Sequence, residues 1–325
     1  MQTLRYILMR LAKAAVILFA IVILNFCLIH AAPGDPAAVM AGEAGASDEL
    51  FLQQLREKFG LDQPFHVQLW KYVSGLLQLD MGYSYRQDAP VWDLIMDRLP
   101  ATLLLTGAAF LLSILLGVVA GVMAAVRVGK WADTAITVAA LLLYATPLFW
   151  VALMAILLFS VQLGWFPSYG MESIGSELTG LSYWLDVAHH LVLPATTLGL
   201  FFTAIYTRMT RASFLETAAE DFVKTARAKG LSEGKIARRH ILRNAILPVV
   251  TLAGLQAGQI VGGAVLTETV FAWPGIGRLM FDALLQRDYN VLLGVFLISS
   301  AMVLLFNLIT DLIYLLVDPR IELNT

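Results

Sequence analysis

Six long apolar runs constrain what this chain of 325 residues can fold into. The runs lie at about Leu11–Ala31, Ala101–Val126, Thr134–Val161, Leu191–Met209, Leu247–Leu266 and Val291–Val317. Each is long enough for a bilayer, which a helix crosses with roughly 20 apolar residues. Only 14% of the residues are charged, whereas about 25% are charged in an average soluble domain. We therefore predict an all-α, polytopic membrane protein with six transmembrane helices.

The distribution of Lys and Arg predicts the orientation, because cytoplasmic loops carry an excess of both. With the N-terminus inside, 15 of the 22 basic residues fall in cytoplasmic segments, and nine of them lie between Arg208 and Arg243. The loop from Gln162 to His190, on the opposite side, contains none. We therefore expect both termini and the polar stretch Glu216–Pro248 to lie in the cytoplasm.

The breaks between the apolar runs divide the chain into three segments. Residues 1–36 form an N-terminal cytoplasmic segment and the first transmembrane helix, which stops at Pro33 and Pro36 because proline does not continue a helix. Residues 37–100 form an extracytoplasmic helical cap, with one helix expected from Asp48 to Phe59. Residues 101–325 form the transmembrane core, with a cytoplasmic loop at 210–246.

Two of the runs contain residues that are unusual inside a membrane. Pro147 interrupts the third run, which predicts a kink with either a structural or a gating role. In the fifth run Gly254, Gly258 and Gly262 recur every four residues and favour close helix packing. A neighbouring face carries Gln256, Gln259 and Gly263. Glutamines are costly in lipid, so this face either packs against other helices or lines a translocation path.

Several kinds of chemistry are missing from the sequence. The phosphate-binding loop pattern, in which two glycines are separated by four residues and followed by Lys and Ser or Thr, does not occur. The nearest approach, Gly230 to Gly234-Lys235-Ile236, has the wrong spacing. The five histidines lack metal-ligand spacing, and carboxylates do not recur across the runs as a proton relay would require. We therefore expect no enzymatic activity, no bound cofactor or metal and no nucleic-acid partner, and any transport must draw its energy from another protein.

The polar cytoplasmic loop reads as helix, glycine turn, helix. An apolar stripe on the first helix, expected over Phe214–Lys229, consists of two adjacent rows, one of Phe214, Ala218, Phe222 and Ala226 and one of Leu215, Ala219 and Val223. Gly230 suits a left-handed stop, and Ser232 is placed to cap the second helix. That helix has an apolar row at Ala237, Ile241 and Ala245 and a basic row at Lys235, Arg239 and Arg243. Such a loop could lie on anionic lipid, bind a cytoplasmic protein or be a solvated connection.

A set of short motifs, in order along the chain, carries a family resemblance. They are Ala32-Pro33-Gly34-Asp35-Pro36, Met81-Gly82-Tyr83-Ser84, Thr225-Ala226-Arg227-Ala228-Lys229-Gly230-Leu231-Ser232, Glu268-Thr269-Val270-Phe271, Arg287-Asp288-Tyr289 and Asp318-Pro319-Arg320. With these motifs the chain resembles the B-type permease subunit of the dipeptide, oligopeptide and nickel ABC importers. The loop resembles their cytoplasmic coupling loop, although Lys224 stands where the general importer pattern has Glu.

The resemblance implies a type I importer permease fold in the bacterial inner membrane. It implies half of a translocation path for di- or oligopeptides, with nickel, glutathione or an opine- or sugar-like solute as alternatives and a stand-alone ion-coupled carrier as a distant one. The implied partners are a second, C-type permease, two ATPase subunits that hold ATP and Mg, an external solute-binding protein and membrane lipid. The implied ATPase-coupling residues are Phe222, Lys224, Thr225, Ala226, Arg227, Lys229, Gly230 and Ser232.

Overall fold

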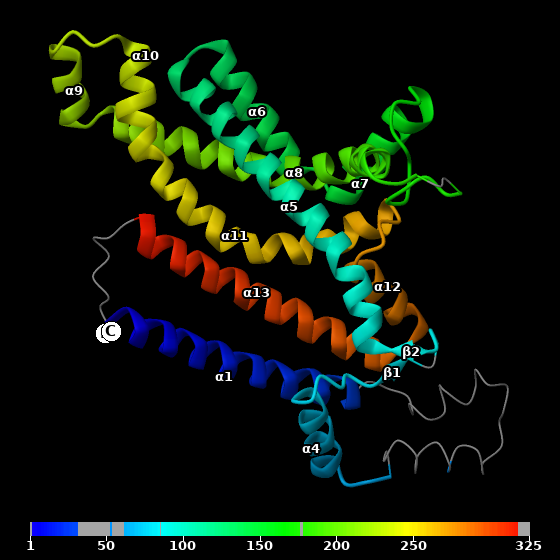
Figure 1. The fold of residues 1–325 in the computed structure, drawn as a ribbon. Coiled ribbons are helices and arrows are strands. Elements are labelled where there is room, and N and C mark those ends of the chain that lie inside the picture. The colour runs from blue at the N-terminus through cyan, green and yellow to red at the C-terminus, as the bar shows by residue number, and fades with distance from the viewer. Residues whose placement is uncertain (1, 32–52, 54–61, 85, 176–177, 318–325) are drawn as a thin grey trace. The chain divides into compact units, whose positions relative to one another are not determined.

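A computed structural model of the chain describes residues 2–31, 53, 62–84, 86–175 and 178–317 (Figure 1). Within the helices, the side chains at 2–7, 29–31, 259–263 and 311–317 lie outside this description. The helix expected from Asp48 to Phe59 also falls outside the described residues. The described chain divides into two compact units, one formed mainly by Met1–Pro100 and Gly275–Leu304, the other by Ala101–Pro274 and Leu305–Glu322.

The described helices match the six predicted spans. Five helices are long and apolar enough to cross a membrane, and a bent pair can form a sixth span. The five long spans lie in helices α1 (Gln2–Ala31), α5 (Val91–Val126), α8 (Leu181–Ala218), α11 (Leu242–Val270) and α13 (Tyr289–Val317). The prediction of an all-α polytopic fold is therefore confirmed.

The third predicted span is broken rather than gently kinked. Helix α6 (Trp131–Ala145) ends at Thr146, and α7 (Leu148–Ala155) begins after Pro147 and continues as the π-helix η1 (Ile156–Gln162). The chain bends by 104° between these two halves of the span. Pro147 has no N–H to donate, and the backbone of Thr146 is extended, so the helix ends there. The Thr146 hydroxyl donates to the carbonyl of Leu142 at 2.7 Å and satisfies one of the acceptors this break exposes.

The first unit contains a small outer element that ties two distant motifs together. Strands β1 (Tyr83–Ser84) and β2 (Ala89–Pro90) form a hairpin, which follows α4 (Phe65–Leu76). The Ser84 hydroxyl donates to the Asp288 carboxylate, and the Asn290 amide donates to the Tyr83 carbonyl at 2.9 Å. Asp288 also accepts from the N–H of Val291 in the first turn of α13. The hairpin is therefore fixed to the turn between α12 (Ile276–Gln286) and α13.

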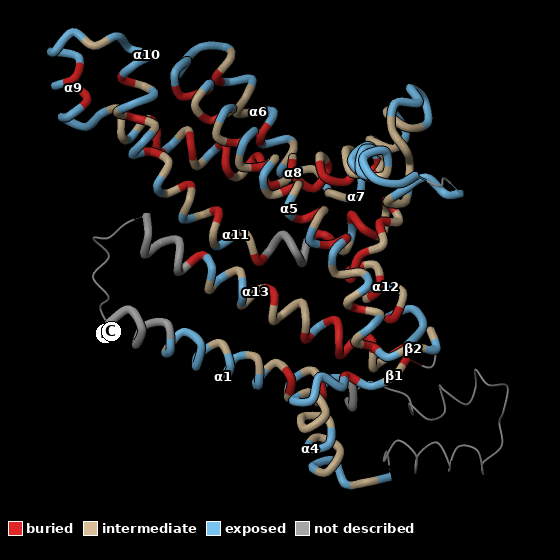
Figure 2. Tube along the Cα trace, viewed as in Figure 1, coloured by how far each residue is buried: buried red, intermediate tan, exposed pale blue. Residues whose placement is uncertain are grey.

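The second unit is built around α8, which is buried along most of its middle (Figure 2). Helix α5 crosses it closely, because a Cβ on Gly117 would overlap the Cβ of Tyr206, and one on Gly121 would lie 2.5 Å from the Cβ of Thr210. Small residues let two helix backbones approach in this way. The surrounding core combines residues of α5, α8 and α11 with the turn that follows α11: Ala101, Leu105, Ala109, Val187, Ala195, Leu198, Phe202, Tyr206, Val249, Ala253, Ala264 and Trp273.

Candidate functional site

The predicted cytoplasmic loop begins with two helices rather than the single helix expected over Phe214–Lys229. Helix α8 ends at Ala218 and α9 begins at Asp221, with Glu220 in an extended conformation between them. The apolar spacing of four continues through this break, so the sequence pattern gave no sign of it. Figure 1 shows α9 and the following α10 (Glu233–Ile236) at one end of the second unit, where α8 ends and α11 begins.

Part of the predicted apolar stripe on α9 faces inward. Val223 and Ala226 are buried, and they pack with Phe214, Ile236, Ile241, Ala245 and Ala125 in a small apolar cluster. Phe222, another member of the predicted stripe, is 42% exposed. Of the eight residues named from the resemblance, Ala226 lies inside, whereas the other seven lie on the exposed surface. We call these seven the coupling surface: Phe222, Lys224, Thr225, Arg227, Lys229, Gly230 and Ser232.

Gly230 ends α9 in the left-handed conformation that its position predicted, with φ of 76°. Its N–H donates to the carbonyl of Arg227 at 2.9 Å, and the N–H of Leu231 donates to that of Ala226 at 3.4 Å. These two bonds form a Schellman motif, which satisfies carbonyls that the helix end leaves open. A Cβ on Gly230 would meet nothing within 4 Å. Backbone conformation, rather than space, therefore favours glycine here.

An ion pair crosses the turn at Gly230. Arg227 donates to the two carboxylate oxygens of Glu233 at 2.9 and 3.3 Å, and this carboxylate raises the pKa of the guanidinium. Ser232 occupies the N-cap position of α10 as predicted, but its side chain makes no capping hydrogen bond. Its backbone carbonyl accepts from the N–H of Lys235 instead. The turn is thus held by backbone bonds and by one exposed ion pair.

The second helix of the loop contains a π-helical turn, η2 (Ala237–Ile241). Because π-helical bonds join residues five apart, the buried row runs through Ile236, Ile241 and Ala245. Ala237, the first residue of the predicted row, is half-buried and packs against the same cluster, and Ile236 adds a fully buried residue that the predicted row did not include. The basic side chains of this helix, namely Lys235, Arg238, Arg239 and Arg243, are all exposed.

The glycine face of α11 packs against α13, whereas the role of its polar face stays a prediction. Gly254 and Gly258 face inward, and the Thr310 hydroxyl of α13 donates to the carbonyl of Gly254 at 3.1 Å. Gln256 is half-buried, and its side-chain oxygen is buried without a hydrogen-bond partner among the described residues. The side chains of Gln259 and Gly263 lie outside the described residues.

One buried carboxylate was not identified from the sequence as a site residue. Glu268 in α11 is fully buried and accepts a hydrogen bond from the Thr102 hydroxyl of α5 at 2.6 Å. Nearby, the indole N–H of Trp273 donates to the carbonyl of Ala101 at 2.8 Å. Glu268 belongs to one of the motifs that carried the resemblance, and that membership was the only signal for it.

Comparison with known proteins decides the family. A family model described as "Binding-protein-dependent transport system inner membrane component" matches residues 117–323, and the model of its N-terminal region matches residues 3–106. The chain belongs to this family. It is therefore an inner membrane component of a binding-protein-dependent ABC importer, as the motifs indicated.

Relatives of this membrane component align with it over nearly their whole length. The dipeptide transport system permease protein DppB of Escherichia coli strain K12 is 41% identical, with 98% of this chain and 99% of the relative covered. The oligopeptide transport system permease protein AppB of Bacillus subtilis strain 168 is also 41% identical at the same coverage. The glutathione transport system permease protein GsiC of an Escherichia coli O6:H1 strain is 39% identical.

A solved structure supports the fold of the membrane component. An inward-facing structure of the MetNI methionine ABC transporter superposes with a TM-score of 0.56, over 69% of this chain and 96% of that chain. The sequence identity is 19%, so the likeness concerns the fold. The importer permease fold expected from the motifs is thereby confirmed.

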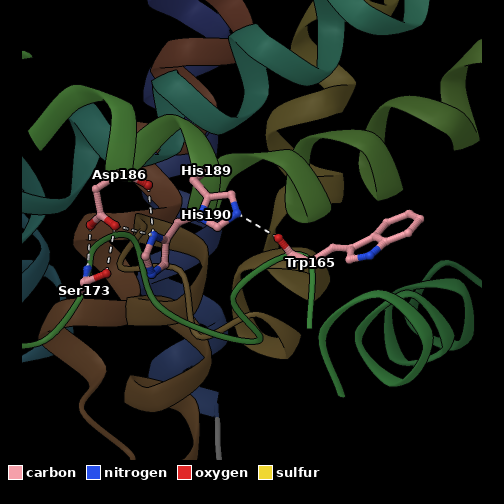
Figure 3. A network of polar contacts seen from close by, with 5 residues as sticks. All are labelled: Trp165, Ser173, Asp186, His189 and His190. Carbon is pink, nitrogen blue, oxygen red and sulfur yellow. Dashed lines mark hydrogen bonds and ion pairs between the residues drawn. The ribbon is translucent and has the colours of Figure 1, made fainter. Parts of the chain in front are cut away.

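The loop between η1 and α8, on the predicted outer side of the membrane, is joined to α8 by hydrogen bonds (Figure 3). The Asp186 carboxylate accepts from the N–H of Ser173 at 2.7 Å and from its hydroxyl at 2.8 Å. His189 Nε2 lies 2.9 Å from the carbonyl oxygen of Trp165, and His190 Nδ1 lies 2.9 Å from that of Asp186. The two imidazole rings are inclined at 82° to each other. The bonds of Asp186 and His189 hold the loop against α8, whereas the His190 contact lies within that helix.

Proposed function

We propose that this chain is the permease subunit of an ATP-driven importer of short peptides and forms half of the translocation path. The observation that carries the proposal is the alignment at 41% identity with a dipeptide permease over 98% of this chain. A solute-binding protein delivers the peptide to the outer face. A second, C-type permease supplies the other half of the path, and two ATPase subunits, with ATP and Mg bound, supply the energy.

The coupling surface has the chemistry expected of an ATPase contact. Phe222 is exposed on α9, and the same short helix also exposes the cationic side chains of Lys224 and Arg227. An exposed aromatic side chain inserts well into an apolar pocket, and cationic neighbours favour an acidic rim around it. An ATPase groove of that kind fits this surface better than lipid does, because α9 has no wide apolar face left exposed.

The loop is also stiff enough to transmit displacement. The Schellman motif at Gly230 fixes α9 relative to α10, and the exposed pair Arg227–Glu233 adds a weaker contact. The buried contacts of Val223 and Ala226 join α9 to the spans. When the ATPase subunits close on ATP, they displace α9, and the packed cluster passes that displacement to α8 and α11. The permease thereby alternates between its inward-open and outward-open states.

The path itself lies beside α11 in this proposal. The half-buried Gln256 belongs to the polar face of this helix. Its side-chain oxygen is buried in this structure, and it can accept from the backbone N–H or ammonium groups of a peptide only in a state of the permease that exposes it. Gln259 and Gly263 belong to the same predicted face.

The proposal is tested by uptake into proteoliposomes that contain this chain, its partner permease and the two ATPases. Radiolabelled dipeptide and purified solute-binding protein are added outside, and ATP is enclosed within. We expect uptake that requires ATP and the binding protein, and competition by unlabelled di- and tripeptides. Absence of ATP-dependent uptake for every peptide tested would refute the proposal.

Glutathione is a specific second candidate, because a glutathione permease is 39% identical to this chain. The same assay separates the two substrates. If the substrates are short peptides, excess glutathione should compete only weakly with the labelled dipeptide. If the substrate is glutathione, labelled glutathione should be taken up and excess dipeptide should compete only weakly with it. Nickel chloride serves as the third competitor.

A further inference from the structure

The cytoplasmic end of α8 contacts four other helices within five residues. Thr210 abuts Gly121 of α5, and Arg211 pairs with Asp133 of α6. The Ser213 hydroxyl donates to the carbonyl of Ala245 in α11 at 2.9 Å, and Phe214 packs in the apolar cluster with Val223 of α9. Whatever moves α9 therefore acts on α5, α6 and α11 through this segment.

The contact with α6 differs from the others because it is ionic and bidentate. The Arg211 Nε–H donates to Asp133 Oδ1 at 2.6 Å, and its Nη2–H donates to Oδ2 at 2.8 Å. The Asp133 side chain is 8% exposed and that of Arg211 is 31% exposed. A planar guanidinium held at two oxygens resists both sliding and rotation, whereas apolar side chains slide past one another more easily.

The carboxylate of Asp133 is itself fixed to the turn between α5 and α6. It accepts from the N–H of Gly129 at 3.1 Å and lies 3.5 Å from the Thr137 hydroxyl. Gly129 occupies the left-handed region, with φ of 76°. The pair thus attaches α8 both to the first turn of α6 and to the turn before it. A displacement of Arg211 therefore acts on this whole segment of backbone and not on the Asp133 side chain alone.

Helix α6 leads from this attachment to the break at Pro147. Its 15 residues run from Trp131 to Ala145, and the chain then bends by 104° into α7. A displacement applied at Asp133 is carried by a helix about 22 Å long to the one bent pair among the described spans. A second contact joins α6 and α8 near the break, where the rings of Tyr144 and Phe201 stack at 5.7 Å.

We infer that Arg211 and Asp133 are positioning residues, which transmit movement of the coupling helix α9 to the broken span α6–α7. This inference rests on the proposed function, since it assigns a role within ATP-driven transport. The pair makes α6 move together with α8. The ATPase cycle thereby reaches the broken span and opens and closes the path. Without the pair, α9 still receives the movement of the ATPase, but α6 follows it incompletely.

The test measures the number of peptides imported per ATP hydrolysed by the complete reconstituted importer. We expect Arg211→Gln to lower this ratio about tenfold, the scale set by losing a charge-assisted bidentate contact, while the four subunits still co-purify. Arg208→Gln is the matched control, because it removes an exposed Arg one turn earlier on the same helix. The control should retain the wild-type ratio.

A charge exchange distinguishes a specific pair from general damage. The double variant Asp133→Arg with Arg211→Asp should recover a large part of the ratio that each single variant loses. If Arg211→Gln prevents assembly, Arg211→Lys is assayed instead, because it keeps the charge without the bidentate fork, and a ratio about threefold lower is expected.

A wild-type ratio in whichever single variant assembles, or no recovery in the double variant, overturns the inference. Failure of the wild-type complex to import peptide is a separate result that refutes the proposed function itself.

Discussion

Thr310 of α13 occupies the space beside Gly254 of α11 that any larger residue would need. A Cβ on Gly254 would overlap Thr310 Cγ2 and would lie 3.0 Å from both Thr310 Cβ and Oγ1. The Thr310 hydroxyl meanwhile donates to the carbonyls of Gly254 and Phe306, at 3.1 and 2.7 Å. Rotation of Thr310 away from a new side chain would therefore break hydrogen bonds.

The close approach at Gly254 predicts a loss of stability on enlargement. We expect Gly254→Val to destabilise the purified protein by about 1–3 kcal/mol, the usual cost of overpacking a well-packed contact. Thermal unfolding in detergent measures it. The matched control is Gly107→Ala in α5, where a Cβ would meet nothing within 4 Å. The loss should shrink in a Thr310→Ser background, and an unchanged midpoint in Gly254→Val would contradict the packing role.

The left-handed backbone of Gly230 predicts a graded series of variants. Gly230→Leu should reduce ATPase co-purification and uptake, because a side chain there costs about 1–2 kcal/mol in the left-handed region and deforms the end of α9. Gly230→Asn should retain more activity, since Asn tolerates this conformation. Binding-protein-stimulated ATP hydrolysis is the measurement. Equal activity in all variants would show that the turn plays no part in coupling.

The exposed pair Arg227–Glu233 should matter less than Gly230. Both side chains are largely in solvent, at 47% and 71% exposure, where salt screens the attraction. We expect Glu233→Gln to change stimulated ATP hydrolysis by less than about twofold, with the difference vanishing at high salt. A loss as large as that of Gly230→Leu would assign the carboxylate a direct role in contacting the ATPase.

Gln256 provides a test of the path. Gln256→Leu keeps the side-chain size, and we expect it to alter the concentration dependence of peptide uptake while the complex still assembles. Leu255→Ala, at an exposed neighbouring position, is the control for general disturbance of α11. Loss of assembly without a separate effect on uptake would mean that Gln256 serves helix packing.

The pair Ser84–Asp288 predicts how firmly the outer hairpin is held. Asp288→Asn should destabilise the hairpin by about 1.5–3 kcal/mol, because a buried carboxylate loses charge-assisted bonds from Ser84 and Val291. Asp88→Asn is the control, since Asp88 accepts an exposed bond from Tyr83 at 2.7 Å. Amide hydrogen exchange of residues 81–91 reports the difference. Equal protection in both variants would refute the anchoring role.

The sequence by itself determined the spans and the local stops. Apolar length fixes which segments can cross a bilayer, and the break at Pro147 and the left-handed turn at Gly230 follow from the backbone chemistry of single residues. The motifs likewise indicated the family before any contact was known. These features depend on a residue and its near neighbours, so they can be read in order along the chain.

Tertiary structure decided which faces meet and which residues form pairs. The break between Ala218 and Asp221 and the π turn at 237–241 redirect α9 and α10 so that Val223 and Ile236 become buried. Neither is visible in a spacing of four, because packing selects them over a continuous helix. Arg211 and Asp133 are 78 residues apart, and each alone is an ordinary charged residue near a span end. Only the folded chain brings them within hydrogen-bonding distance, where two charge-assisted bonds join them.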